Sequence, residues 1–247
     1  MIKSSRFKTI PPEHYDGWYE TPSGKWTGRR ELTLVLDALE PVGGDSILDI
    51  GCGTGWFTRQ LGELTGVSVT GVDIDEKWLE YARSRDASSF YCQANALALP
   101  FEDQSFSHVL SITALCFTPD WKSAIAEAVR VAKKRIAIGL LNRNSLLWWQ
   151  KGRKQGTAFD GADWISPDEL MQVARSLPLE DIRISTAIYF PSGSAFAQAS
   201  ERILENRLKC GSFLLLTATV IPRAGFAGQG KQTRRTENQT HFLPVSV

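Results

Sequence analysis

The chain has 247 residues, of which 43% are hydrophobic and 22% are charged, and its formal net charge at pH 7 is +1. That length and composition suffice for one large core, and the near-zero charge offers no general attraction for nucleic acid or an anionic membrane. The four cysteines lack paired metal-ligand spacing, the N-terminus lacks an apolar signal core, and the longest apolar run, over 213–221, is too short to span a bilayer. We therefore expect a cytoplasmic protein with no metal site, no nucleic-acid partner and no membrane insertion.

The N-terminal part begins with a polar arm over residues 1–12, and the segment 13–28 then carries four aromatic residues among glycines and prolines. This segment either fixes the arm onto the body of the protein or closes over a bound ligand as a lid that excludes water. Apolar residues at helical spacing predict an amphipathic helix over 29–39.

The most informative stretch follows this helix. An apolar strand predicted at Ser46–Ile50 runs into a turn with glycines at alternate positions, Gly51, Gly53 and Gly55, and a helix begins directly after the turn. Glycine has no Cβ, so such a turn lets a ligand lie against bare backbone. This order of elements is typical of sites that bind nucleotides.

A second apolar strand, over 68–73, ends in an acid. Asp73 lies 22 positions after Gly51. A carboxylate at the end of the neighbouring strand can accept hydrogen bonds from both ribose hydroxyls of an adenosine. Together, the turn and the acid predict an adenosine-containing ligand.

The residue after the turn separates two classes of cofactor. Dinucleotide enzymes place a third glycine beside the pyrophosphate, where this chain has Trp56. The bulk of Trp56 argues against a nicotinamide oxidoreductase and favours a ligand without phosphate, such as S-adenosylmethionine. The run Leu48–Gly55 resembles the first motif of class I methyltransferases, and the chain is similar to small-molecule methyltransferases of the ubiquinone/menaquinone-biosynthesis type over 13–150 and more loosely over 150–222.

The resemblance implies a Rossmann-like α/β fold: a mostly parallel, doubly wound sheet of seven strands whose last strand is antiparallel. Apolar and alternating runs predict strands at 46–50, 68–73, 90–93, 106–111, 135–141, 182–190 and 213–221. Further helices are predicted after Trp56, after Asp75, over 121–131, after Ser166 and in the excursion 191–208 that precedes the last strand. We expect one methyltransferase domain over 1–222, with a lid segment at 13–28, and a disordered polar tail over 223–247.

The third predicted strand leads into Ala94-Asn95-Ala96. In the resembling family this position usually reads Gly-Asp-Ala, and its acid hydrogen-bonds the adenine amino group. The Asn95 carbonyl can still accept from that amine, so we expect weaker adenine binding rather than its loss, with the Ala96 N–H addressing the ring. Alternatively, Asn95 only forms a turn.

The loops after the fourth and fifth strands are expected to face the reacting groups, because loops beyond the carboxyl ends of strands build the site in such sheets. Ser111 and Thr113 are predicted cofactor contacts. Cys116 either faces the substrate or fills the core. After the fifth strand, Asn142, Arg143 and Trp148 either line the substrate site or belong to an ordinary packed helix, and the basic residues after Gln150 form a solvated loop or meet an anionic substrate group.

The predicted ligand contacts fall into two sets. The cofactor is S-adenosyl-L-methionine, with S-adenosyl-L-homocysteine as product, and the residues predicted to bind it are Asp49, Gly51, Cys52, Gly53, Gly55, Asp73, Ile74, Asn95, Ala96, Ser111, Thr113, Tyr15 and Tyr19. The residues predicted to contact the acceptor are Trp18, Cys116, Asn142, Arg143 and Trp148.

The predicted activity is S-adenosylmethionine-dependent methyl transfer to a small-molecule acceptor by in-line displacement, which needs mainly proximity, orientation and a dry site. The alternative is a methyltransferase-like protein that binds the cofactor without transferase activity. Only His14 lies near the predicted site as a candidate base, whereas His108 is expected to be structural. The acceptor atom and the oligomeric state stay open.

Overall fold

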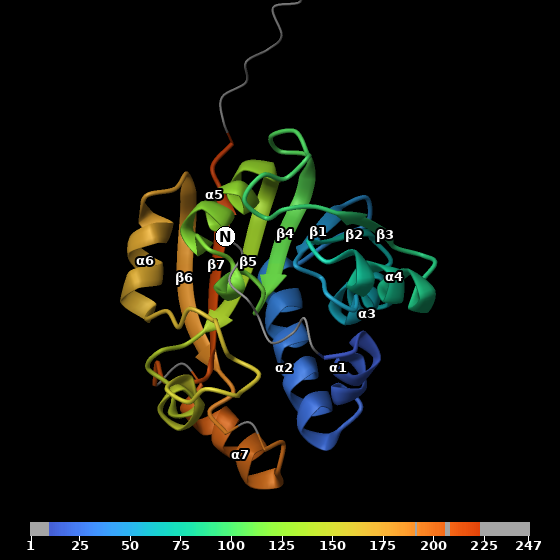
Figure 1. Ribbon diagram of the computed structural model, residues 1–247. Helices are drawn as coiled ribbons and strands as arrows, with labels where there is room; N and C mark the ends of the chain where they lie inside the picture. The colour runs from blue at the N-terminus through green and yellow to red at the C-terminus, as the bar shows by residue number, and fades with distance from the viewer. Residues whose placement is uncertain (1–9, 191, 206–207, 223–247) are drawn as a thin grey trace, which may run out of the picture.

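The computed structural model describes residues 10–190, 192–205 and 208–222. The predicted tail over 223–247 and residues 1–9 of the predicted arm lie outside the described residues. Within them the chain forms one seven-stranded sheet with helices on both faces (Figure 1). None of the described helices is long and apolar enough to cross a membrane.

The sheet has the strand order β3-β2-β1-β4-β5-β7-β6. Strands β1 to β5 pair in parallel, and β7 pairs antiparallel with both β5 and β6. The predicted fold, a mostly parallel sheet with its last strand antiparallel, is therefore confirmed. The strands are β1 Ser46–Ile50, β2 Ser68–Asp73, β3 Phe90–Gln93, β4 Phe106–Ile112, β5 Ala132–Leu141, β6 Leu179–Ala187 and β7 Phe213–Val220.

Helices cover both faces because successive strand residues point to opposite sides. Ile47 of β1 packs into a buried cluster with residues of α2 and α3, and its neighbour Leu48 packs into another with residues of α5 and α6. The helices are α1 Pro12–Trp18, α2 Pro22–Leu39, α3 Trp56–Thr65, α4 Glu76–Arg85, α5 Trp121–Val131, α6 Pro167–Arg175 and α7 Ala195–Leu204, with a 3-10 turn at Leu115–Phe117 and a π-helical turn at Trp148–Gly152.

The segment 13–28, for which no helix was predicted, is largely helical. It lies in α1 and in the first turns of α2, which begins at Pro22 instead of near residue 29. Both prolines, Pro12 and Pro22, occupy first helical turns, where a missing N–H costs nothing. The Thr21 side chain caps α2 by accepting from Gly24 N at 3.1 Å.

Two other boundaries also differ from the sequence prediction. Strand β6 begins at Leu179 and ends at Ala187, before the predicted end at Phe190, and the next residue, Ile188, has a φ of 61°. Strand β5 begins at Ala132, directly after α5. The start of α6 is as predicted, because Ser166 forms a capping box with Glu169.

The carboxyl ends of the parallel strands meet at one end of the sheet. In Figure 1 the arrows of β4 and β5 point toward this end, where α1 and α7 also lie. The glycine turn after β1 and the loop after β4 therefore come together here, as the topology requires.

Candidate active site

The glycine turn has a backbone that other residues would strain. Gly51, Gly53 and Gly55 have φ values of 74°, 55° and 74°, in the left-handed region. A Cβ on Gly51 would overlap the Ala114 side chain. The N–H groups of Gly51 and Cys52 both donate to Val72 O, at 2.7 and 3.0 Å, and fasten the turn to β2.

Asp73 lies at the end of β2, beside this turn. Its Oδ2 accepts from Gly53 N at 2.9 Å, and its Oδ1 accepts from Asp75 N at 3.0 Å. Burial raises the pKa of the Asp73 carboxyl above its ordinary value, while these two N–H groups act in the opposite direction. The carboxyl is therefore held in one orientation at the wall of the pocket.

Asp49 lies beneath the turn rather than in the pocket wall. It is buried, and its Oδ2 accepts from the Thr58 hydroxyl at 2.7 Å. Burial raises the pKa of Asp49 to about 7. Gly55 is also outside the pocket wall, and a Cβ there would lie 2.7 Å from the Tyr91 hydroxyl.

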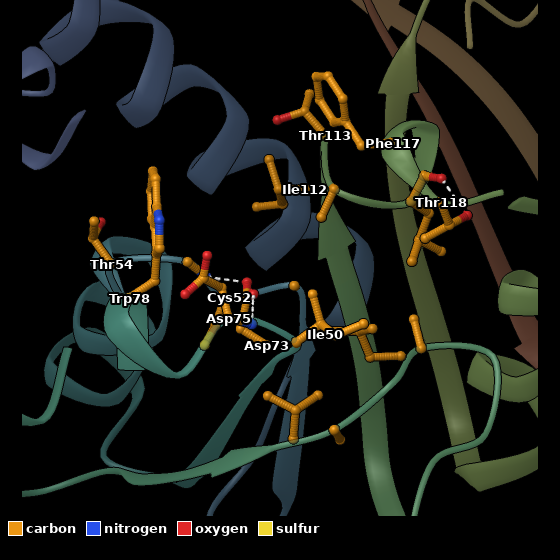
Figure 2. A pocket seen from close by; sticks show the side chains of 18 of the residues that line it. Ile50, Cys52, Thr54, Asp73, Asp75, Trp78, Ile112, Thr113, Phe117 and Thr118 are labelled. Atoms are coloured by element: carbon orange, nitrogen blue, oxygen red, sulfur yellow. Dashed lines mark hydrogen bonds between the residues drawn. The ribbon is translucent and has the colours of Figure 1, made fainter. Parts of the chain in front are cut away.

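A pocket of about 260 Å³ opens between the turn, α1 and the loops after β2, β3 and β4. Figure 2 shows the carboxyl side chains of Asp73 and Asp75 at one end of the pocket, and the side chains of Thr113 and Phe117 at the other. The predicted cofactor-binding residues that line the pocket are Tyr15, Tyr19, Gly51, Cys52, Gly53, Asp73, Ile74, Asn95, Ala96 and Thr113.

Aromatic rings form the wall beside α1. Tyr19 stacks on Trp56, with ring centroids 4.3 Å apart and planes at 10°, and Tyr15 meets Trp78 edge-on at 5.0 Å. A side-chain hydrogen bond links the two tyrosines, and burial raises the pKa of Tyr15 to about 12. Trp56, the residue at the third-glycine position, thus contributes to the pocket wall.

One residue that the sequence interpretation missed fastens α1 over the pocket. Asp16 is buried, and its carboxylate accepts from Arg59 Nη2 at 2.9 and 3.2 Å and from the Tyr81 hydroxyl at 3.3 Å. Arg59 also donates to Thr54 O at 2.7 Å. An acid in a segment without a clear helical pattern gave no signal for this role.

At the end near β3, Asn95 forms the turn that was the alternative interpretation. Its Oδ1 accepts from Leu97 N at 3.0 Å. The residue also lines the pocket, so its amide can meet a ligand with the remaining hydrogen-bonding capacity.

The loop after β4 forms the other end of the pocket. Thr113 has a φ of 51°, a conformation that β-branched residues rarely adopt, and its N–H donates to Gly139 O at 2.9 Å. Ser111 and Cys116 do not line the pocket. The Ser111 hydroxyl donates to Ile50 O at 2.7 Å, and the buried Cys116 Sγ lies 3.3 Å from Thr113 O.

The other predicted acceptor contacts also lie outside the pocket wall. The buried Asn142 Nδ2 donates to Gly211 O at 2.7 Å, and Arg143 pairs with Glu169 at 2.6 Å. The Arg153 guanidinium lies over the Trp148 ring, 4.6 Å from the ring centroid. Trp18 is exposed. The chain around Gly211 instead binds Asn142, whose backbone N–H also donates to Ser212 O at 3.0 Å.

No histidine is among the described residues that line the pocket. His14 is exposed and does not line the pocket. His108 lies buried at the amino end of β4, with Nε2 3.0 Å from Asp45 Oδ2, and burial lowers its pKa. Among residues 10–190, 192–205 and 208–222, no group of three or more His, Cys, Asp or Glu side chains is arranged to hold a metal ion.

The fold and the site define a Rossmann-like α/β protein with a ligand pocket at the carboxyl ends of its strands. Residues 48–137 match the family model described as a methyltransferase domain. The ubiquinone biosynthesis O-methyltransferase of Idiomarina loihiensis is 30% identical over 180 residues, which cover 65% of this chain and 72% of that protein. The chain belongs to the methyltransferase family, and its sheet is that of class I members.

Two further comparisons show the extent of the similarity. O-methyltransferase cnsE of Penicillium expansum is 36% identical over 127 residues, 47% of this chain and 46% of that protein. The chain thus spans about half the length of several curated relatives that it matches. A Thermotoga maritima structure described as a SAM-dependent methyltransferase, possible histamine N-methyltransferase, superposes with a TM-score of 0.66 and 25% identity over 84% of this chain and 94% of that one.

Proposed function

We propose that this chain binds S-adenosyl-L-methionine and catalyses transfer of its methyl group to a small-molecule acceptor, leaving S-adenosyl-L-homocysteine. The observation that carries the proposal is the Asp73 carboxyl, fixed by Gly53 N–H at the wall of a pocket that the glycine turn also lines. Its place in a methyltransferase domain supports the choice of cofactor.

The residues present fit that cofactor. Asp73 offers a fixed carboxyl to the ribose hydroxyls, and Asn95 and Ala96 line the same end of the pocket for the adenine. Gly51 and Gly53 leave bare backbone where a side chain would fill the space, which suits the methionine part. Bound there, the sulfonium supplies an activated methyl group with a good leaving group.

The chain's own contribution to the reaction is to position the acceptor and to exclude water. The aromatic wall of Tyr15, Tyr19 and Trp56 covers one side of the pocket, and Ile112 and Phe117 line the other. An apolar enclosure of this kind holds the reacting atoms in line and keeps water away. It also favours an acceptor with an apolar body.

The chemistry of the acceptor is proposed from the relatives. Two of them are named as O-methyltransferases, and the Thermotoga structure is described as a possible N-methyltransferase. We propose an acceptor that carries a hydroxyl or an amine. Cys52, Cys92, Cys116 and Cys210 form no disulfide with one another, which supports a cytoplasmic location.

The test has two parts. Calorimetric titration with S-adenosyl-L-methionine is expected to show binding, and no binding up to millimolar concentration would refute the proposal. Incubation of the protein and cofactor with a small-molecule extract, followed by mass spectrometry, is expected to show S-adenosyl-L-homocysteine and a methylated product. Binding without either product would instead identify a cofactor-binding protein without transferase activity.

A further inference from the structure

Asp16 joins three helices that meet around the pocket. It lies on α1, and its side chain is 11% exposed. Its carboxylate accepts from Arg59 of α3, at 2.9 and 3.2 Å, and from the Tyr81 hydroxyl of α4, at 3.3 Å. Hydrogen bonds are directional, so these donors fix the position of α1 relative to both α3 and α4.

Each of these three helices carries aromatic rings that line the pocket. They are Tyr15 on α1, Tyr19 at its C-terminal end, Trp56 at the start of α3 and Trp78 on α4. The rings also meet between helices, since the stack of Tyr19 on Trp56 joins α1 to α3 and an edge-on contact joins α1 to α4. The placement of α1 by Asp16 therefore determines how these rings enclose the pocket.

Arg59 extends the connection to the glycine turn. Its Nη2 donates to Asp16, and its Nη1 donates to the carbonyl oxygen of Thr54 at 2.7 Å. Thr54 belongs to the turn and lines the pocket, on the same side as Trp78 in Figure 2. The planar guanidinium presents its donors in a fixed geometry. One side chain thus fixes α1 relative to the backbone that is expected to lie against the cofactor.

The ion pair between Asp16 and Arg59 is enclosed. The Arg59 side chain is 12% exposed, so solvent and salt screen the pair only weakly. Loss of either partner leaves the other charge buried and unpaired, which is costly. The nearby pair of Glu20 and Lys25 is different, because both of its side chains are exposed and such surface pairs contribute little.

We propose that Asp16 and Arg59 are positioning residues for the bound cofactor, and that they act as one unit that holds the rings of α1 against the glycine turn. Neither residue lines the pocket, so both act through the rings and the turn. A pocket that is already shaped before binding has a higher affinity, because less ordering is needed when the ligand enters. The inference rests on the proposed function for the identity of the ligand.

The first test is calorimetric titration of the full chain with S-adenosyl-L-homocysteine, well below the unfolding temperature of each variant. Asp16→Asn removes the charge and keeps the shape, and we expect it to bind at least about tenfold more weakly than the wild type. Glu20→Gln breaks the exposed pair with Lys25 and is the matched control, expected to stay within about twofold. An unchanged affinity in folded Asp16→Asn would overturn the inference.

A milder variant covers the case in which Asp16→Asn does not fold. Arg59→Lys keeps the positive charge but loses the fork that reaches both Asp16 and Thr54. We expect about three- to tenfold weaker binding, the loss typical of one hydrogen bond. The variant with both substitutions is expected to bind within about twofold of Asp16→Asn, because residues that act as a unit are not additive. Multiplied losses would show that the two residues act separately and would overturn the inference.

Hydrogen exchange of the ligand-free chain provides a readout that needs no cofactor. In Asp16→Asn we expect exchange at least about tenfold faster both in α1 and in the first turns of α3, with the amides of β4 and β5 unchanged. Faster exchange in α1 alone would show a merely local role, and faster exchange throughout the sheet would show a general loss of stability. Either result would overturn the inference.

These outcomes are separable from failure of the proposed function. If the wild-type chain binds neither S-adenosyl-L-methionine nor S-adenosyl-L-homocysteine, the proposed function is refuted, and hydrogen exchange still decides whether Asp16 and Arg59 couple α1 to the turn. Wild-type binding together with an unchanged affinity in Asp16→Asn refutes only the positioning role.

Discussion

Two buried acids of this protein have opposite surroundings. Asp45, just before β1, accepts from Lys134 Nζ at 2.6 Å and from Val42 N at 3.0 Å, and its Oδ2 lies 3.0 Å from His108 Nε2. Glu31, near the aromatic wall of the pocket, has none of these. Hydrogen bonds from Lys134 and Val42 hold the pKa of Asp45 well below its usual range, while burial raises that of Glu31 to about 8.

The difference separates an acid whose oxygens the fold pairs from one whose oxygens the described residues leave without a hydrogen bond or ion pair. At the amino end of the sheet, every oxygen of Asp45 is paired by the chain itself. On α2, the described residues give the buried Glu31 carboxyl no hydrogen-bond or ion-pair partner. A buried charge without a partner costs stability, so Glu31 is expected to destabilise the fold when its carboxyl is charged.

Replacing Asp45 tests the paired side of the comparison and is expected to have the largest effect on stability. Asp45→Asn removes the charge that Lys134 and His108 meet, and we expect the free energy of unfolding to fall by about 3 kcal/mol near neutral pH. Because the folded-state pKa lies below the unfolded one, the wild-type contribution is present above about pH 4 and is lost as the pH falls. Urea unfolding at several acidic pH values measures the loss in the free energy of unfolding and its pH dependence. An Asp45→Asn variant as stable as the wild type would show that the paired Asp45 does not stabilise the fold.

Asp73 combines features of both acids. Two backbone N–H groups donate to its carboxyl, and the residue also lines the pocket. Asp73→Ala removes hydrogen bonds to the cofactor ribose and is expected to weaken S-adenosyl-L-methionine binding by about 10- to 150-fold, or roughly 1.5–3 kcal/mol. Calorimetry provides the measurement. An unchanged affinity would exclude Asp73 from the cofactor site, and Asp37→Asn, exposed on α2, serves as the control.

Replacing Glu31 is expected to change the free energy of unfolding in the opposite direction to replacing Asp45. Burial raises the pKa of Glu31 in the folded state from 4.5 to about 8. Below pH 4.5 the carboxyl is neutral in both states, and the folded state keeps its full stability. As the pH rises toward about 8, ionisation favours the unfolded state and that stability is lost. Glu31→Gln is therefore expected to increase the free energy of unfolding by about 1–3 kcal/mol at pH 8, because a neutral amide replaces a buried charge. At pH 4.5 the variant and wild type should differ little. Urea unfolding at both pH values checks this; lower stability of the variant at pH 8 would show that Glu31 has a stabilising partner.

The smallest expected effect concerns Asp49, another buried acid, whose carboxyl accepts a hydrogen bond from the Thr58 hydroxyl. Thr58→Val removes the 2.7 Å hydrogen bond to Asp49 and keeps the shape of the side chain. We expect a loss of about 1 kcal/mol in the free energy of unfolding at pH 8, where Asp49 is charged, and a smaller loss below pH 6. Thr33→Val, on the exposed side of α2, is the control.

Much of the fold was predictable because its signals are local. The glycine turn, the apolar strands and the capping serine of α6 each need only a few neighbouring residues. Asp73 and Asn95 were placed at the pocket because the carboxyl ends of parallel strands meet at one edge. That these residues bind a cofactor stays a prediction.

The acceptor end was less predictable because it depends on contacts between distant segments. Asn142 follows β5 at the correct edge, but its amide is taken up by Gly211, nearly seventy positions later. The burial of Glu31 was missed because a glutamate in an amphipathic helix is usually exposed. Only the packing of α1 and its rings against α2 shows that this face is buried.

The stack of Tyr19 on Trp56 has a consequence for observing how the pocket admits a ligand. One ring belongs to the junction of α1 and α2, and the other begins the helix after the glycine turn. If α1 moves to admit a ligand, the rings must separate, and the Trp56 indole meets water. The pocket therefore carries its own optical signal, in which the emission of Trp56 reports whether the entrance is open or closed.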